Sequence, residues 1–171
     1  MASLTSVLRS AVASILRTTK TTIASPDSRA DERGRSGSTA TVEVEPSRLG
    51  RVKMTYVPST DGNPDPGEIV WTWVPYEERD GRGKDRPVLL VATEADGTAV
   101  ALQLTSKPHG GDGNFVAIGR GSWDFEGRQS WVALDRVFRV QPAGMRREAA
   151  AIDAAEFRRV TEALASRYGW S

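Results

Sequence analysis

The sequence predicts a mainly β protein, built as a small β-barrel with one α-helix at its C-terminal end. Two observations predict it. The second half of the chain is a series of short apolar runs joined by brief, glycine-rich connections such as Gly110-Gly111-Asp112-Gly113. Short strands at this spacing are typical of a small barrel. One apolar stripe at helical spacing follows them, and a single helix of that kind can cover the open side of a barrel.

The N-terminal third of the chain is predicted to stand apart from this barrel. Residues 1–24 carry apolar side chains at helical spacing and only basic charges, which predicts an amphipathic helix. The same composition is typical of an organelle transit peptide or of a helix on a membrane surface, and a marginal helix that packs on its own domain is the plainer interpretation. Residues 25–65 are predicted to be a linker with two possible short strands, around Val42 and Val44 and over 52–57.

Residues 66–171 are predicted to form the barrel domain. Its expected strands are Glu68–Val74, Pro87–Thr93, Ala99–Thr105, Phe115–Ile118, Ser130–Leu134 and Val137–Val140. Asp153 and Glu156 form a capping box that predicts the start of the helix, and Gly169 predicts its end. The apolar stripe between them consists of Phe157, Val160, Leu164 and Tyr168.

Composition excludes several classes of function. The chain has no cysteine and one histidine, which excludes disulfides, thiol catalysis, cysteine zinc sites and multi-histidine metal sites. No metal ion and no cofactor are expected. The formal net charge of +1 argues against a long basic track for duplex DNA. No run approaches the roughly 20 apolar residues of a membrane span, and the lack of cysteine fits a cytoplasmic protein.

The stretch from Pro66 to Ser106 is the most informative part of the sequence. It contains the segments P-G-E-I-V-W, D-R-P-V-L-L-V and L-T-S, in three successive predicted strands. Arg86 stands at the start of the second strand and Thr105 at the end of the third. An antiparallel pair of strands can hold these two ends side by side, which would join one cation and one hydroxyl in a local anion site.

These segments, in this order, resemble the opening strands of the MazF/PemK (Kid-like) toxins. The later segment S-W-V-A-L-D-R-V-F-R-V resembles the strand that precedes their C-terminal helix, so the resemblance covers Pro66 to Gly169 and leaves out residues 1–65. It implies an SH3-like barrel of the MazF/PemK/CcdB type that works as a homodimer. It also implies a metal-independent endoribonuclease that cleaves single-stranded RNA, including mRNA, by attack of the 2′-hydroxyl. An antitoxin protein with a disordered tail would control it, and DNA would be contacted only through the antitoxin complex.

Arg86 and Thr105 are the first candidate catalytic residues that the resemblance implies. Arg86 matches the arginine that opens the second strand in these toxins, where a guanidinium can fork onto two phosphate oxygens. Thr105 matches the hydroxyl residue that ends the third strand and can hold a phosphate oxygen or the attacking 2′-hydroxyl. The structural alternatives are an exposed Arg86 paired with Asp85 or Glu78, and an ordinary strand-end threonine at position 105.

His109 and Asp135 are expected to assist catalysis. Imidazole changes charge near neutral pH, so His109 could act as a general acid or base, with a solvated loop histidine as the alternative. Asp135 matches an acidic position in some family members. Two residues earlier, where some relatives carry arginine, this chain has Ala133, and Arg136 or Arg139 of the same stretch is the candidate to compensate for this departure.

Four further residues are expected to bind RNA. Lys84 and Lys107 carry positive charge beside the two strand ends, and Ser106 adds a second hydroxyl. Trp73 can stack on a base, although a core position is the plainer interpretation for both Trp73 and Trp71, which share one strand face.

Two other functions stay open at this stage. A catalytically inactive barrel could act as a nucleic-acid- or protein-binding module, which the alanine at position 133 and the N-terminal extension favour. A relative directed at DNA gyrase is the third interpretation, because CcdB-type toxins share the fold. The segment 42–57 could also lie over Arg86 and Thr105 and inhibit the protein.

Overall fold

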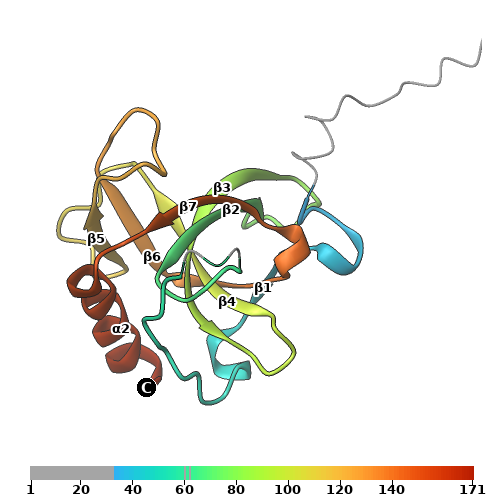
Figure 1. Ribbon diagram of the computed structural model, residues 1–171, viewed down its shortest axis with the longest axis horizontal. Helices are drawn as coiled ribbons and strands as arrows, with labels where there is room; N and C mark the ends of the chain where they lie inside the picture. Colours follow the sequence, from blue (N-terminus) through green and yellow to red (C-terminus); the bar gives the residue numbers. More distant parts are fainter. Residues whose placement is uncertain (1–32, 60, 62) are drawn as a thin grey trace, which may run out of the picture.

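The computed structural model describes residues 33–59, 61 and 63–171, which contain seven strands, one long helix and three 3-10 turns (Figure 1). The strands are β1 (Val42–Val44), β2 (Glu68–Pro75), β3 (Gly83–Thr93), β4 (Ala99–Thr105), β5 (Phe115–Gly119), β6 (Ser130–Val140) and β7 (Arg146–Ala151). The helical elements are η1 (Gly37–Thr39), η2 (Pro46–Arg48), η3 (Pro142–Gly144) and α2 (Ala154–Tyr168). The predicted helix over 1–24 lies outside the described residues.

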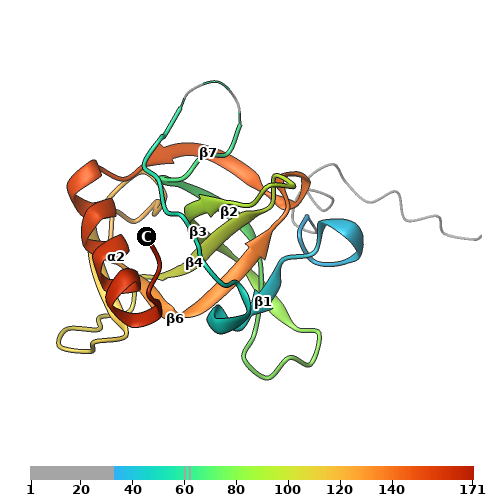
Figure 2. The same cartoon turned by 90° about the horizontal axis from the view of Figure 1, so that it is seen from below.

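All seven strands belong to one antiparallel sheet, ordered β1-β6-β4-β3-β2-β7, with β5 also paired to β6. The sheet curls around itself, and within the described residues no ladder joins its end strands β1 and β7, so the barrel stays open. The helix α2 and the segment that precedes β1 lie at opposite ends of the molecule (Figure 2). A mainly β fold with a C-terminal helix was predicted, and it is confirmed.

The central strands β3 and β4 are buried on both faces, which explains their continuous apolar runs. Alternate residues of β3 join different apolar clusters, so the two clusters lie on opposite faces of the sheet. The first cluster includes Leu89 and the buried side of α2. The second consists of Val70, Val74, Val88, Leu90, Ala99, Ala101, Phe138, Val140 and Met145.

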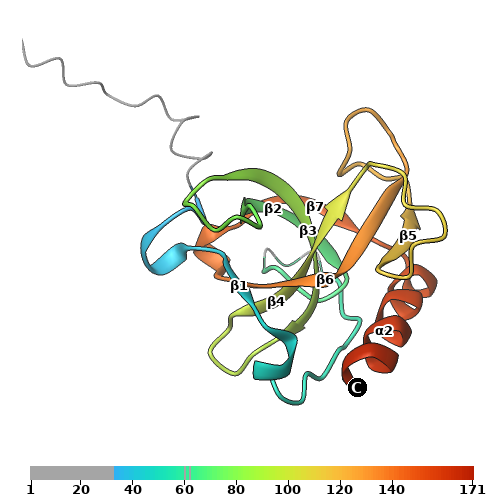
Figure 3. The ribbon, with the colours of Figure 1, turned by 180° about the vertical axis from the view of Figure 1, so that it is seen from behind.

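The helix α2 begins and ends where its sequence predicts. The Asp153 carboxylate accepts a 2.7 Å hydrogen bond from the Glu156 amide, and the Glu156 side chain accepts one from the Asp153 amide, which completes the capping box. Gly169 follows the last turn with a φ of 69°, a conformation that glycine adopts readily. The buried face of α2 packs against β5 and β6, as seen from behind in Figure 3.

The segment before β2 is part of the folded domain. The predicted strand around Val42 and Val44 is observed as β1, which pairs with β6. The second predicted strand, over 52–57, is not a strand. Its backbone instead bonds to the end of the chain, with Met54 N donating to Ser171 O at 2.6 Å and Ser171 N donating to Val52 O at 3.0 Å.

Two features of the sheet differ from the prediction. The two strands expected over 130–134 and 137–140 are one long strand, β6. The strand β7 was not predicted, because its sequence R-R-E-A-A-A has low β propensity and no alternation. Its long-range pairing with β2 determines its conformation, through a register that shifts between Ile69 and Val70.

Candidate active site

A cleft of about 540 Å³ opens where β3 begins and β4 ends. Its walls come from the ends of β2, β3 and β4 and from the loop between β5 and β6. The lining residues are Trp71, Tyr76, Lys84, Asp85, Arg86, Pro87, Leu104, Thr105, Ser106, Lys107, Trp123, Asp124, Phe125, Glu126, Arg128 and Ser130.

Arg86 and Thr105 face this cleft from neighbouring strands. The ladder between β3 and β4 pairs Val88 with Gln103, and the same register continued by two residues sets Arg86 across from Thr105. The Thr105 hydroxyl oxygen accepts a 3.2 Å hydrogen bond from the Lys107 amide. That bond uses an oxygen lone pair and leaves the hydroxyl proton available for a ligand.

The acidic side chains of the cleft are neutralised by arginines. Asp85 forms an ion pair with Arg146 of β7. Arg128 pairs with both Asp124 and Glu126, each at 3.0 Å. The carboxylates therefore do not compete for the other cations of the cleft.

Three cations in the cleft have no such partner. Within the described part of the chain, Lys84, Arg86 and Lys107 make no side-chain hydrogen bond and no ion pair. Unpaired ammonium and guanidinium groups in a concave site attract anions, and a guanidinium can bind a phosphate through two parallel hydrogen bonds. The charge distribution of the cleft therefore favours the binding of anions.

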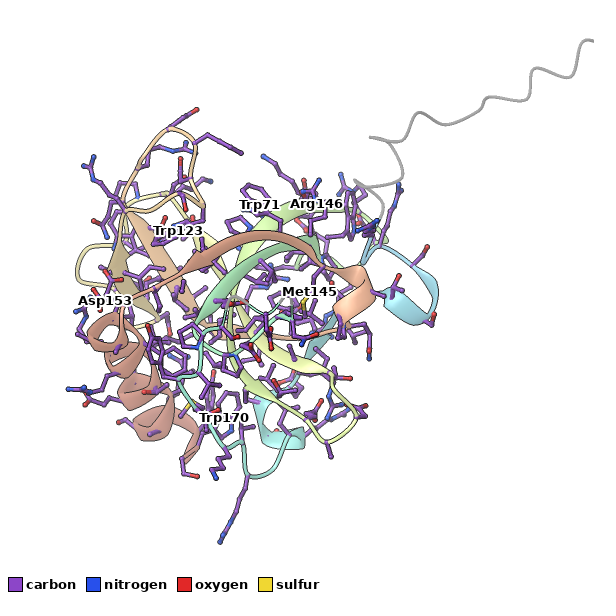
Figure 4. The ribbon with its side chains drawn as sticks, in the orientation of Figure 1. Trp71, Trp123, Met145, Arg146, Asp153 and Trp170 are labelled. Atoms are coloured by element: carbon purple, nitrogen blue, oxygen red, sulfur yellow. The ribbon has the colours of Figure 1, made fainter. Side chains whose placement is uncertain are left out.

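Aromatic side chains also line the cleft. Trp123 is only 4% exposed, and its Nε1 donates a 3.0 Å hydrogen bond to Ser130 Oγ. Trp71 contributes a ring whose buried Nε1 finds no acceptor among the described residues. Figure 4 shows Trp71 beside Arg146, its register partner on β7, with Trp123 toward the helix side of the molecule. Phe125 is 85% exposed at the rim.

The loop between β2 and β3 closes on itself beside the cleft. Asp80 accepts hydrogen bonds from the Arg82 backbone amide at 3.0 Å and from Arg82 Nε at 2.6 Å. The backbone hydrogen bond, followed by the side-chain hydrogen bond, lowers the pKa of Asp80 below its ordinary value. Arg82 is thereby engaged within its own loop and does not line the cleft.

No described group of three or more histidine, aspartate or glutamate side chains is arranged to hold a metal ion. Among the described helices, none is long and apolar enough to cross a membrane.

Comparison with known proteins identifies the family. A family model described as "PemK-like, MazF-like toxin of type II toxin-antitoxin system" matches residues 65–167. The chain belongs to the PemK-like, MazF-like toxins of type II toxin–antitoxin systems. The resemblance inferred from the motifs is thus confirmed, and β1 with the segment before it lies outside the match.

Solved structures similar to this PemK-like chain include MazF from Deinococcus radiodurans (Form-I), which is 24% identical, with a TM-score of 0.48, over 63% of this chain and 97% of that chain. A MazE–MazF structure from the same organism (Form-III) is 22% identical, with a TM-score of 0.46, over 63% of this chain and 98% of that chain. No curated protein sequence matches the chain significantly.

The cleft of the PemK-like chain brings together five of the eight residues expected to act on RNA. These five are Lys84, Arg86, Thr105, Ser106 and Lys107. The other three lie elsewhere. Trp73 shares its strand face with Trp71 but does not line the cleft, and the Arg35 guanidinium covers its ring at 5.0 Å.

His109 and Asp135 also lie outside the lining of the cleft. The His109 ring stacks on Phe115, with ring centroids 3.5 Å apart and planes 10° from parallel, and Trp131 contacts its edge. Asp135 is exposed on β6, and its neighbour Arg136 turns inward to bind Glu43. Neither His109 nor Asp135 lines the cleft, and their assisting role stays a prediction.

The departure at Ala133 is not compensated by the nearby arginines. Ala133 is buried, opposite Phe115 in the ladder between β5 and β6. Arg136 binds Glu43, and Arg139 binds Glu94 through two hydrogen bonds of 2.7 Å. Both guanidiniums are therefore committed to structural ion pairs away from the cleft.

The hypothesis that 42–57 covers the catalytic residues is wrong. No described residue of the segment 33–59 lines the cleft. β1 instead extends the sheet beside β6, at the opposite end of the strand order from β2 and β7.

Sequence reasoning missed several residues of the cleft. It also missed Arg146, which pairs with the cleft residue Asp85 without lining the cleft itself, because β7 carries no strand signal. Phe125 was missed because it lies in a polar turn, although one aromatic residue between Asp124 and Glu126 is itself an unusual composition that could have marked it.

Proposed function

We propose that this PemK-like toxin is a metal-independent endoribonuclease that cleaves single-stranded RNA, including mRNA. The observation that carries the proposal is the unpaired Arg86 guanidinium, which lies in one cleft with the Thr105 hydroxyl and two unpaired lysines. The family match supports a toxin function for the protein that carries this anion-binding cleft.

The proposed reaction uses the substrate's own 2′-hydroxyl as the nucleophile. The 2′-oxygen forms a bond to the adjacent phosphorus, and the bond from phosphorus to the 5′-oxygen breaks. The products carry a 2′,3′-cyclic phosphate and a 5′-hydroxyl. The proton lost by the 2′-hydroxyl is balanced by the proton gained by the 5′-oxygen, so no co-reactant is consumed.

Arg86 stabilises the charge that develops on the phosphate oxygens during this attack. Its two parallel N–H groups match two phosphate oxygens, and the cation is in place before the reaction begins. Thr105 donates its hydroxyl proton to a phosphate oxygen or orients the 2′-hydroxyl. Positioned charge of this kind is the largest single term in many enzymes, which is why a site without a metal can suffice.

Lys84, Ser106 and Lys107 hold the RNA on either side of the reacting phosphate. The two lysines are exposed and unpaired in the described part of the chain, so they can contact the flanking phosphates. We propose that the substrate is single-stranded, since a cleft with aromatic walls accepts unstacked bases and a rigid duplex would keep them paired.

An antitoxin and a second copy of the chain are the proposed protein partners. Membership in a type II toxin family supports an antitoxin that binds over the cleft. The homodimer is proposed from the family resemblance, and any contact with DNA would pass through the antitoxin. The proposed place of action is the cytoplasm, where mRNA is the substrate.

The test is incubation of the full chain with a long single-stranded RNA in EDTA. The expected result is cuts at a short recurring sequence, with 2′,3′-cyclic phosphate and 5′-hydroxyl ends. RNA with 2′-O-methyl groups should resist, because it lacks the nucleophile. Binding of RNA without any cleavage would contradict the proposal and would favour an inactive binding module.

A further inference from the structure

Phe125 is the most exposed of the large apolar side chains in the described part of the chain. It is 85% exposed, against 55% for Val57 and 51% for Val42. A phenylalanine ring in water is unfavourable, so an exposed ring that is held at a cleft points to a ligand that covers it.

The loop between β5 and β6 holds Phe125 in place. The buried Trp123 ring anchors the loop, and Gly121 lets it approach, since a Cβ at that glycine would lie 2.0 Å from the indole. Asp124 accepts hydrogen bonds from the Glu126 amide at 2.9 Å and from Arg128 Nε at 3.0 Å. These bonds fix the turn on both sides of Phe125.

Trp71 lines the same cleft and carries a hydrogen-bond donor without an acceptor among the described residues. Trp71 Nε1 is buried, and within the described residues it has no acceptor. A buried donor without a partner is costly, so a ligand that brings an acceptor to this atom is favoured. Both Phe125 and Trp71 line the cleft that contains Arg86.

A nucleobase has the chemistry that fits these two groups. Its flat face can stack on a phenyl ring, and its edge carries carbonyl or ring-nitrogen acceptors. Its phosphate matches the unpaired cations Lys84, Arg86 and Lys107. A lipid phosphate or an acidic peptide would also pair with these three cations. Neither class of ligand would explain the exposed ring of Phe125.

We propose that Phe125 and Trp71 form a nucleobase subsite next to the phosphate site at Arg86. Phe125 stacks on the base of a nucleotide that adjoins the bound phosphate. Trp71 Nε1 donates to an acceptor on a base edge and thereby contributes to the sequence preference of cleavage. This inference rests on the proposed function and adds specificity-determining residues to it.

The first arm of the test measures binding of a short single-stranded RNA made uncleavable by 2′-O-methyl groups. Alanine substitution of a stacking aromatic costs about 1–3 kcal/mol per base, so Phe125→Ala should weaken binding roughly 5- to 150-fold. Phe125→Trp should retain binding, and Phe125→Leu should lose most of it, because leucine is apolar without a π face. Val57→Ala is the matched control, since Val57 is exposed and lies outside the cleft.

The second arm uses an oligonucleotide of the same length without bases. Phe125→Ala should bind it as the unaltered chain does, whereas Arg86→Ala should bind both oligonucleotides more weakly. Trp71→Phe keeps a ring and removes the donor, and it should change the base preference at the cleaved position.

Equal RNA binding by Phe125→Ala and the unaltered chain would overturn the subsite, even if RNA is still cleaved. Unchanged RNA binding with weaker binding of an antitoxin would also overturn it, since Phe125 would then serve a protein surface. An unchanged base preference in Trp71→Phe would remove Trp71 from the subsite. Failure of the proposed function is a separate result, in which the unaltered chain neither binds nor cleaves RNA.

Discussion

The ion pair between Glu43 and Arg136 joins the N-terminal segment to the barrel, and its removal should destabilise the whole domain. Arg136 Nε and Nη2 donate to the two Glu43 carboxylate oxygens, both at 3.0 Å. The same guanidinium donates to Gln103 Oε1 at 3.1 Å and to Pro75 O at 2.9 Å. The two charged side chains are only 12% and 15% exposed. Glu43 therefore neutralises a nearly buried cation on β6 that bonds to residues of β1, β2 and β4.

The substitution Glu43→Ala leaves that cation without its carboxylate. Removing one partner of a buried pair costs about 3–5 kcal/mol. Arg136 keeps its hydrogen bonds to Gln103 and Pro75, so the lower end, about 3 kcal/mol, is expected. For a domain of this size each kcal/mol lowers Tm by about 2–4 °C, which gives a loss of about 6–12 °C.

Urea and thermal unfolding of the full chain measure this loss. Glu45→Ala is the matched control, because Glu45 is 62% exposed and reaches Arg79 only at 3.9 Å, so its loss should stay within about 0.5 kcal/mol. The double variant Glu43→Ala with Arg136→Met should recover much of the stability, since it removes the uncompensated charge. A Glu43→Ala loss no larger than that of Glu45→Ala would refute the reasoning.

Three further substitutions test other parts of the structure. Gly83→Ala should lower the free energy of urea unfolding by about 1–3 kcal/mol, because its Cβ would lie 2.5 Å from Val74 O and 2.6 Å from Trp73 Nε1. Gly113→Ala is the control, since its Cβ would contact nothing within 4 Å, and its effect should stay within about 0.5 kcal/mol. Equal losses for the two variants would contradict the close packing at Gly83. Burial raises the pKa of Glu156, so the contribution of this carboxyl to stability is fully present below its unfolded pKa and is lost as the pH rises through the folded pKa. Glu156→Gln cannot ionise, so its free energy of unfolding should rise relative to that of the unaltered chain between about pH 3 and about pH 7. A difference between the two proteins that does not change with pH would contradict this prediction. Joint replacement of Lys84 and Lys107 by alanine should weaken the salt dependence of single-stranded RNA binding. The slope of the log binding constant against the log salt concentration, measured between about 50 and 200 mM salt, should become shallower by about 0.7 per lysine. An unchanged slope would show that these lysines do not contact phosphates.

Local signals explain the parts of the fold that could be predicted. The strand Ala99–Thr105 has the predicted bounds, because an Asp-Gly turn precedes it and a polar, glycine-rich loop follows it. The helix α2 is bounded by Asp153 and Gly169, whose capping chemistry acts within a few residues. Such features depend on neighbours in sequence, so the sequence alone reveals them.

Long-range pairing explains what could not be predicted. β7 has residues that disfavour strands, and only its ladder with β2 makes it one. The placement of Arg86 beside Thr105 was predictable, since consecutive antiparallel strands bring those ends together. The positions of His109, Phe125 and Arg146 depend on how loops and distant strands pack together, which spacing along the chain does not encode.

The most direct test of the proposed cleft is the rate of RNA cleavage in EDTA by the full chain and two arginine variants. Arg86→Ala should lower kcat/KM by about 10²–10³, the loss expected when one positioned charge is removed from the transition state. Arg158→Ala, which removes an exposed guanidinium from α2, should cleave at the parental rate. Equal rates for Arg86→Ala and Arg158→Ala would contradict the assignment of this cleft as the catalytic centre.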